Sequence, residues 1–282
     1  LLVPGDAQGT LYKWVSWLTG SKNALKGIGF FLGGALLASF GFKASIAVLA
    51  MALALVWVAS LAMLQKDLGK AKTKPKFTEL LSKSRAINFL SAARSFLFGA
   101  RDVWFVVALP VYLGSELGWS HMAVGSCLAF WVVGYGAVQS LAPSITGKRS
   151  SKVPDGKMVF AWAVALTTVP ALIAIALLNE ARPELFLLGG LALFGVLFAV
   201  NSSMHSYLIV SYAGHDGLSL DIGFYYMANS TGRLIGTVLS GLVYQQAGLE
   251  ACMLVSSAFL GMAALLTLFL PRHRREQNSA LQ

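Results

Sequence analysis

The stretch RSFLFGARD, residues 94–102, places three charged side chains within an otherwise apolar segment of the chain. No other residue between positions 86 and 113 carries a full charge. A helix crosses the roughly 30 Å hydrocarbon core of a bilayer with about 20 residues, so this segment is long enough to span it. A charged side chain at the centre of such a helix costs about 2.5–3.5 kcal/mol even on a lenient scale. Arg94, Arg101 and Asp102 therefore require a structural or functional reason.

The composition of the whole chain predicts an all-α membrane protein. Its 282 residues are 56% hydrophobic and only 12% charged, which is too little charge to cover a soluble domain of this size. Apolar runs of spanning length recur along the chain. We predict eight transmembrane helices, at residues 12–40, 43–64, 86–113, 121–145, 158–178, 185–212, 221–245 and 250–270.

The first of these helices has two possible placements. Residues 27–40 form an apolar run that is too short to cross a bilayer alone. Either the helix begins upstream near Leu11, which draws Lys22 and Lys26 to membrane depth, or it is short and tilted. In the second case both lysines would extend to the lipid headgroups.

The net charge of +10 is concentrated between the apolar runs, which argues against nucleic-acid binding as its cause. Seven Lys or Arg lie in residues 65–85, four in residues 147–157 and three in residues 271–276. The connections predicted on the other side hold Arg182, with Lys43 at a helix edge. By the positive-inside rule, the basic connections and both ends of the chain are expected at the cytoplasmic face.

The longest polar stretch divides the chain unevenly. We predict that residues 1–64 are the last two helices of an N-terminal half, and that residues 65–85 are a basic cytoplasmic linker. Residues 86–270 would then be a six-helix C-terminal half, and residues 271–282 a basic cytoplasmic tail. Matched halves would imply four further helices in front and a twelve-helix protein. The linker's default partner is the anionic lipid bilayer.

Five cations are predicted at membrane depth, with Asp102 as their one plausible deep acidic partner. They are Lys22, Lys26, Arg94, Arg101 and Arg233. Arg94 and Arg101 are seven residues apart, and Lys22 and Lys26 are four apart, so each pair lies on one helix face. Cations of this kind normally face a bundle interior or a water-filled cavity. Because a guanidinium matches phosphate and carboxylate groups, the pattern predicts a site for a multiply charged anion.

Polar side chains accompany these cations on the same or neighbouring predicted helices. Tyr226 and Asn229 share a face with Arg233, Asn201 and His205 are four apart beside Ser202 and Ser203, and another helix holds Tyr135 and Gln139. Other interpretations stay open. The cations can extend to the headgroups, Asp102 can neutralise a cation or exchange protons, and His205 can be a hydrogen-bonded core residue or a proton carrier. Tyr135, Gln139 and Asn201 can be contacts between helices rather than with a ligand.

The sequence predicts no enzyme, cofactor or metal site. Cys127 and Cys252 lie in different apolar runs, and no phosphate-binding loop, zinc motif or nucleophile elbow is present. A membrane enzyme acting on lipid headgroups through His215, Asp216 and Asp221 would lack a nucleophile or a metal-ligand set.

Two sets of small residues are expected to let helices approach closely. Gly29 and Gly33 are four apart, as are Gly232, Gly236 and Ser240.

Several collinear stretches resemble the ArsJ-type organoarsenical efflux permeases of the major facilitator superfamily. They are LTGSKNALKGIGFFLGGALL (18–37), DLGKAKTKPKF (67–77), LLSKSRAINFLSAAR (80–94), LFGARDVWFVVALPVYL (97–113) and FYYMANSTGRLIGTVLSGLVYQ (224–245). The similarity runs through essentially the whole chain. Residues 147–157 depart from it in one respect, because they match the superfamily's loop signature only in a degenerate form.

The resemblance implies a twelve-helix facilitator in the bacterial inner membrane. Its implied function is secondary active efflux of 1-arseno-3-phosphoglycerate by an antiporter, which confers arsenate resistance. Glyceraldehyde-3-phosphate dehydrogenase would be the functional partner, because it makes this ester when arsenate replaces phosphate. The alternative is a facilitator that exports or exchanges another phosphorylated organic anion.

Overall fold

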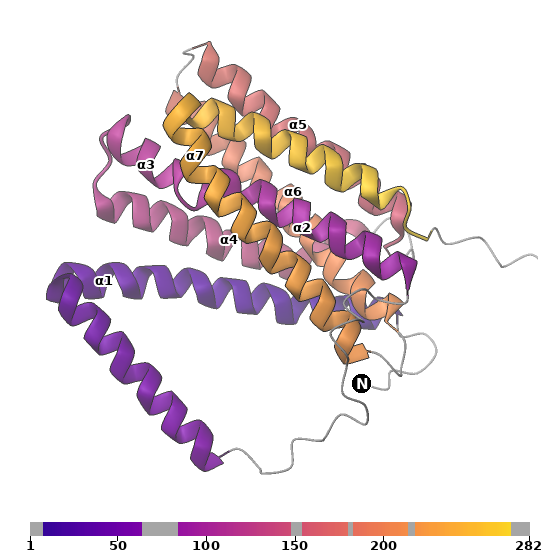
Figure 1. Cartoon of the computed structure of the whole chain (residues 1–282), viewed down its shortest axis with the longest axis horizontal. Helices are drawn as coiled ribbons and strands as arrows, with labels where there is room; N and C mark the ends of the chain where they lie inside the picture. Colours follow the sequence, from indigo (N-terminus) through magenta and orange to yellow (C-terminus); the bar gives the residue numbers. More distant parts are fainter. Residues whose placement is uncertain (1–7, 64–83, 148–153, 180–182, 214–217, 272–282) are drawn as a thin grey trace, which may run out of the picture.

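All regular structure in the computed structural model is helical over the residues it describes, which are 8–63, 84–147, 154–179, 183–213 and 218–271 (Figure 1). The helices are α1 (Gln8–Met63), α2 (Arg85–Phe105), α3 (Ala108–Ser115), α4 (His121–Gly147), α5 (Gly156–Leu178), α6 (Pro183–Tyr212) and α7 (Leu218–Thr267). The predicted linker at 65–85 and tail at 271–282 lie almost entirely outside the described residues.

Two helices are too long for a single crossing and bend at a glycine. α1 has 56 residues and α7 has 50, so at about 1.5 Å per residue each exceeds twice the thickness of a bilayer core. Their chains reverse at Gly41 (φ 69°) and at Gly248 (φ 74°), a backbone conformation that costs glycine little and other residues much. Each long helix therefore has two arms, and these arms correspond to predicted helices.

Six stretches of the described chain are long and apolar enough to cross a membrane. They are Ser39–Met63, Arg85–Ser115, Met122–Thr146, Gly156–Leu178, Pro183–Tyr212 and Leu220–Thr267, the last of which contains both arms of α7. The first arm of α1 is not among them, but its helix begins at Gln8 and continues through Lys22 and Lys26. Of the two predicted placements for this helix, the upstream start is confirmed.

The predicted single helix at 86–113 is wrong in one respect, because it breaks between α2 and α3 at Val106–Val107. Pro110 explains the break, since its ring clashes with the carbonyl of residue 106 and it has no N–H to bond there. The backbone amides of Val107 and Ala108 instead donate to Ser240 Oγ on α7, at 3.3 and 3.0 Å. A neighbouring side chain thus satisfies backbone donors that the bilayer could not.

The bundle is held together by close crossings at small residues. α2 packs mainly against α7, where a Cβ at Gly232 or Gly236 would lie 2.0 Å from the Ser95 carbonyl oxygen or 2.4 Å from that of Gly99. This confirms the close approach predicted for Gly232 and Gly236.

The approach predicted for Gly29 and Gly33 is wrong, because a Cβ at either position would have no atom of the described residues of another helix within 4 Å. The tight α1–α4 crossing uses Gly20, Gly27 and Gly136 instead, where an added Cβ would meet α4 or α1 at 2.1–2.5 Å.

The two arms of α1 have different surroundings. The first arm packs against α4 and α6, and Figure 1 shows it running alongside the bundle. The apolar stretch Ser39–Met63 forms the second arm, which diverges from the bundle and has no buried residue in its most apolar window. The first arm therefore forms one side of the space that the other helices enclose.

Candidate functional site

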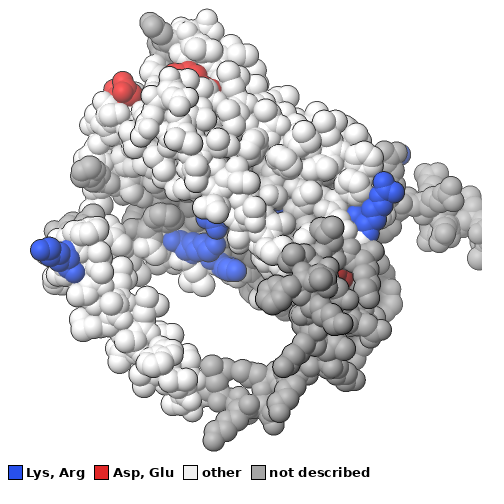
Figure 2. Space-filling model, in the orientation of Figure 1, with Lys and Arg blue, Asp and Glu red and all other residues white. Residues whose placement is uncertain are grey.

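A cavity of about 590 Å³ lies between α1, α2, α4, α6 and α7. Its described wall consists of Leu18, Thr19, Lys22, Asn23, Lys26, Arg94, Phe98, Arg101, Asp102, Phe105, Val106, Leu128, Trp131, Val132, Tyr135, Gln139, Ser206, Tyr226, Asn229 and Arg233. Figure 2 shows Lys and Arg side chains gathered where the first arm of α1 faces the rest of the bundle.

All five cations predicted at membrane depth line this one cavity, together with Asp102. Five positive side chains and one carboxylate give the described wall a formal net charge of four positive. Charges of one sign in a cleft with low-dielectric walls concentrate counter-ions of the opposite sign. The wall is therefore built to attract an anion.

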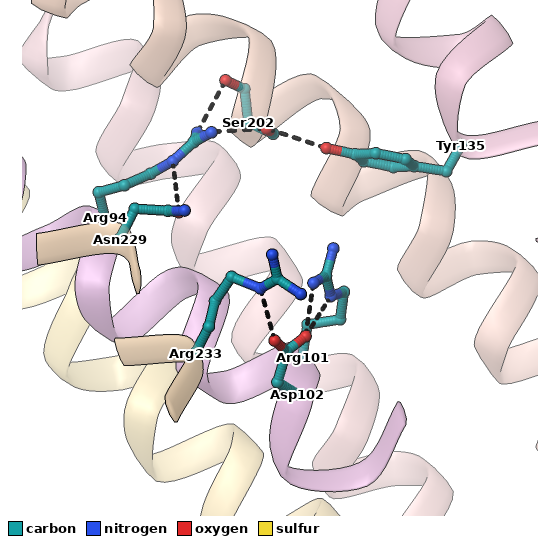
Figure 3. A network of polar contacts seen from close by, with 7 residues as sticks. All are labelled: Arg94, Arg101, Asp102, Tyr135, Ser202, Asn229 and Arg233. Carbon is teal, nitrogen blue, oxygen red and sulfur yellow. Dashed lines mark hydrogen bonds and ion pairs between the residues drawn. The ribbon is translucent and has the colours of Figure 1, made fainter. Parts of the chain in front are cut away.

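Asp102 joins two arginines from different helices. Arg101 donates from Nε to Asp102 Oδ1 at 2.7 Å, and Arg233 of α7 donates from Nε to Oδ2, also at 2.7 Å (Figure 3). The carboxylate is fully buried, whereas the side chains of Arg101 and Arg233 are 13% and 44% exposed. Asp102 is thus a charge partner for both arginines, while each guanidinium keeps further N–H groups for other acceptors.

Arg94, which lies on α2 with Arg101, forms its hydrogen bonds with uncharged groups. Its Nε donates to Asn229 Oδ1 at 3.3 Å, and its Nη1 donates to the carbonyl and hydroxyl oxygens of Ser202 at 3.1 and 3.2 Å. Its Cζ lies 3.9 Å from the centre of the Phe98 ring, an arrangement in which the ring face attracts the cation. Since Asp102 is the one acidic residue on the described wall and already contacts two arginines, the charge of Arg94 is not neutralised by a carboxylate there.

The α4 side of the cavity contacts the same serine. Tyr135 donates its hydroxyl to Ser202 Oγ at 3.0 Å, and Gln139 donates from Nε2 to that oxygen at 3.3 Å. Asn23 of α1 donates from Nδ2 to Gln139 Oε1 at 2.6 Å, so the network extends across the cavity. With Asn229 of α7, which accepts from Arg94, five helices therefore meet in one set of hydrogen bonds.

A sequence model of the Major Facilitator Superfamily matches residues 87–282. The chain belongs to the Major Facilitator Superfamily. It is a multi-pass membrane protein, and members of this superfamily are membrane transporters. The match begins within α2 and extends past α7, so it contains every cavity residue except those of α1. No curated protein matches the chain.

In this facilitator the predicted polar residues divide into those that line the cavity and those that do not. The first group is Tyr135, Gln139, Tyr226 and Asn229, which line the cavity with the cations.

Within the described ranges, no three His, Cys, Asp or Glu side chains are grouped so that they could hold a metal ion.

Asn201 and His205 lie on another face of α6 and do not line the cavity. Asn201 donates from Nδ2 to the backbone carbonyls of Trp162 and Leu197, which ties α6 to α5. His205 is 1% exposed, and its Nδ1 has no hydrogen-bond partner among the described residues. The structure therefore places both side chains in the packing of α6 rather than on the cavity wall.

Sequence reasoning did not single out Asn23 or assign a role to Ser202. Asn23 lies between Lys22 and Lys26 and is uncharged, so no large cost of burial in lipid marks it as it marks the two cations. Ser202 contacts Arg94 of α2 and Tyr135 of α4, and Ser206 lines the cavity. Asn201 and His205 are each one residue away, which on a helix is a turn of about 100°. Buried residues from 199 to 209 occupy every face of α6, so no amphipathic pattern marks its cavity side.

Proposed function

We propose that this facilitator exports a small anionic organoarsenical, 1-arseno-3-phosphoglycerate, and thereby confers arsenate resistance. The observation that carries the proposal is the cavity itself, whose described wall has a formal net charge of four positive. An ester with an arsenate group at one end and a phosphate group at the other is a small metabolite with charge to match. The collinear resemblance to organoarsenical permeases supplies the arsenic part of the proposal.

The separation of two arginines is compatible with a ligand that has two charged ends. The Cζ atoms of Arg94 and Arg101 lie 3.9 and 5.1 Å from the centre of the same Phe98 ring, so they are at most about 9 Å apart, the sum of those lengths. Six bonds separate arsenic from phosphorus in the proposed cargo, which at bond lengths near 1.5 Å is roughly 7–9 Å when extended. One ligand can therefore contact both arginines at once.

Each side chain has a role in this proposal. Arg94 binds one oxyanion with Asn229, Tyr135 and Gln139, while Arg101 and Arg233 bind the other through the N–H groups that Asp102 leaves free. Lys22 and Lys26 close the cavity from α1, and Tyr226 lines the α7 side. Asp102 limits the positive charge of the empty cavity.

The arrangement of the chain in the membrane is part of the proposal. Residues 1–64 belong to the N-terminal half and residues 86–270 form the C-terminal half, so the cavity lies between halves that rock about it. The membrane is the bacterial inner membrane, and the basic connections face the cytoplasm. Glyceraldehyde-3-phosphate dehydrogenase supplies the cargo on that side.

The test measures arsenic uptake into everted membrane vesicles that contain the product of the full-length gene. Uptake from arsenate is expected only when the dehydrogenase, its nicotinamide cofactor and glyceraldehyde 3-phosphate are all present. Arg101→Gln should lower this uptake roughly tenfold or more, because a hydrogen bond to a charged group contributes about 1.5–3 kcal/mol. Arg85→Gln is the matched control, since Arg85 is exposed and contacts Phe89 outside the cavity.

Two results would contradict the assignment. Uptake of free arsenate without the enzyme mixture would remove the ester as cargo. No arsenic uptake from the complete mixture, together with uptake of a labelled stable phosphate ester by the same vesicles, would favour the alternative of a carrier for another phosphorylated anion.

A further inference from the structure

Three hydrogen-bond donors from two helices converge on one neutral oxygen. Arg94 Nη1 of α2 lies 3.2 Å from Ser202 Oγ, and the Tyr135 hydroxyl and Gln139 Nε2 of α4 lie 3.0 and 3.3 Å from it. Figure 3 shows Arg94 and Tyr135 reaching this serine from different sides.

This arrangement contains more donors than acceptors. A hydroxyl oxygen has two lone pairs, so it cannot accept from Arg94, Tyr135 and Gln139 at once. If Ser202 instead donates its proton to Tyr135, the tyrosine proton is left without an acceptor in the network. The Ser202 carbonyl oxygen already accepts from Arg94 and from the Ser206 hydroxyl, so it offers no remedy. In either arrangement at least one donor is left over.

The positions of these groups indicate why the cluster has more hydrogen-bond donors than acceptors. Arg94, Tyr135 and Gln139 line the cavity, whereas Ser202 is fully buried behind its wall. Asp102 is bonded to Arg101 and Arg233, so it does not compensate this cluster. Buried donors without acceptors are costly, and an oxyanion in the cavity offers several lone pairs and no proton to donate.

We infer that Ser202 is the internal acceptor of an oxyanion-binding cluster made by Arg94, Tyr135 and Gln139. In the empty cavity its hydroxyl holds these donors, and the terminal oxygens of a phosphate or arsenate monoester take them over. The inference rests on the proposed function, in that it takes the cavity to bind such an anion. It assigns Ser202 a positioning role and makes the ligand its competitor.

Because Ser202 and the ligand compete for the same donors, truncating Ser202 is predicted to strengthen ligand binding rather than weaken it. Ser202→Ala removes the internal acceptor without touching a group that faces the ligand, so the donors are available from the start. Ligand affinity should therefore rise about fivefold, the equivalent of one ordinary hydrogen bond. A serine that only braces the helices would instead weaken binding when truncated.

The experiment measures binding of 1,3-propanediol bisphosphate to the purified full-length protein by titration calorimetry. This probe carries two phosphate monoesters on a three-carbon chain and has no hydrolysable acyl bond. Ser203→Ala is the matched control, because Ser203 is the adjacent buried serine and pairs with Ser16 of α1 outside the cavity. Its dissociation constant should equal that of the wild type.

A second variant keeps the test decisive if Ser202→Ala does not fold. Tyr135→Phe removes one donor from the cavity wall, so it should weaken bisphosphate binding about fivefold. Weaker or unchanged binding by folded Ser202→Ala, or unchanged binding by Tyr135→Phe, overturns the inference while leaving the anion cavity intact. If the wild type does not bind the bisphosphate at all, the proposed anion cavity fails together with the inference.

Discussion

Asp102 is completely buried and forms ion pairs with two arginines of the cavity. It accepts hydrogen bonds from Arg101 and Arg233, which belong to α2 and α7. Removing one partner of a buried ion pair costs about 3–5 kcal/mol, and the partial exposure of Arg233 places the expected cost near the lower limit. Asp102→Asn should therefore lower the thermal unfolding midpoint in detergent, measured by tryptophan fluorescence.

A second substitution separates this ion pair from a general packing effect. Adding Arg233→Gln to Asp102→Asn removes one of the two unpaired cations, so part of the lost stability should return. If the double variant is no more stable than Asp102→Asn, the ion pair does not account for the loss.

Sequence patterns predicted the charged residues of the cavity and four of its polar residues, whereas they missed Asn23 and the role of Ser202. The cost of a charge in lipid forces Arg94, Arg101 and Arg233 toward a polar interior whatever their neighbours are. No comparable constraint applies to Ser202 or Asn201, because a single hydroxyl or amide is readily satisfied by backbone groups in helix packing. Only the packing of α6 decides that Ser202 contacts the donors of the cavity wall whereas Asn201 contacts α5.

At the scale of helices, the crossing of α2 and α7 determines how near Arg233 comes to Asp102. Gly232→Ala would place a Cβ 2.0 Å from the Ser95 carbonyl oxygen, and overpacking of this kind costs about 1–3 kcal/mol. Gly241→Ala on the same helix is the control, because nothing lies within 4 Å of that position. Gly232→Ala should lower the unfolding midpoint while Gly241→Ala leaves it unchanged or raises it. Equal midpoints for the two variants would show that the helices can separate at no cost.

The sequence predicted the reversals within α1 and α7, but it did not predict the break between α2 and α3. The reversals near Gly41 and Gly248 follow from runs that are too long for one crossing, and the glycine supplies a positive φ. The break between α2 and α3 follows from Pro110, whose effect falls four residues earlier, inside a uniformly apolar run. Spacing of small residues alone did not predict which of them lie at a helix crossing, since Gly20 of α1 contacts α4 whereas Gly29 contacts no other helix in the described ranges.

At the scale of the whole molecule, length and apolarity determine the fold class, because a chain in lipid must satisfy its own backbone hydrogen bonds. The presence of a shared cavity also follows, since five cations at membrane depth cannot all face lipid. The pairing of helices does not follow, because side-chain shape at each crossing decides it. The first arm of α1 illustrates this, since its contact with α4 depends on three glycines that line up only in the folded bundle.

The direction in which the bundle crosses the membrane is testable with two exposed positions at opposite ends. Lys157 lies at the start of α5, next to the basic connection, and Glu116 follows the end of α3. The positive-inside rule places Lys157 at the cytoplasmic face and Glu116 at the outer face. In a background with Cys127 and Cys252 replaced by alanine, a membrane-impermeant maleimide should label Lys157→Cys only in everted vesicles and Glu116→Cys only in intact cells. Unreacted cysteine in each preparation is counted after the membrane is dissolved, which controls for expression. The reverse pattern would put the basic connections outside, and the cavity would then have to be loaded from the opposite side.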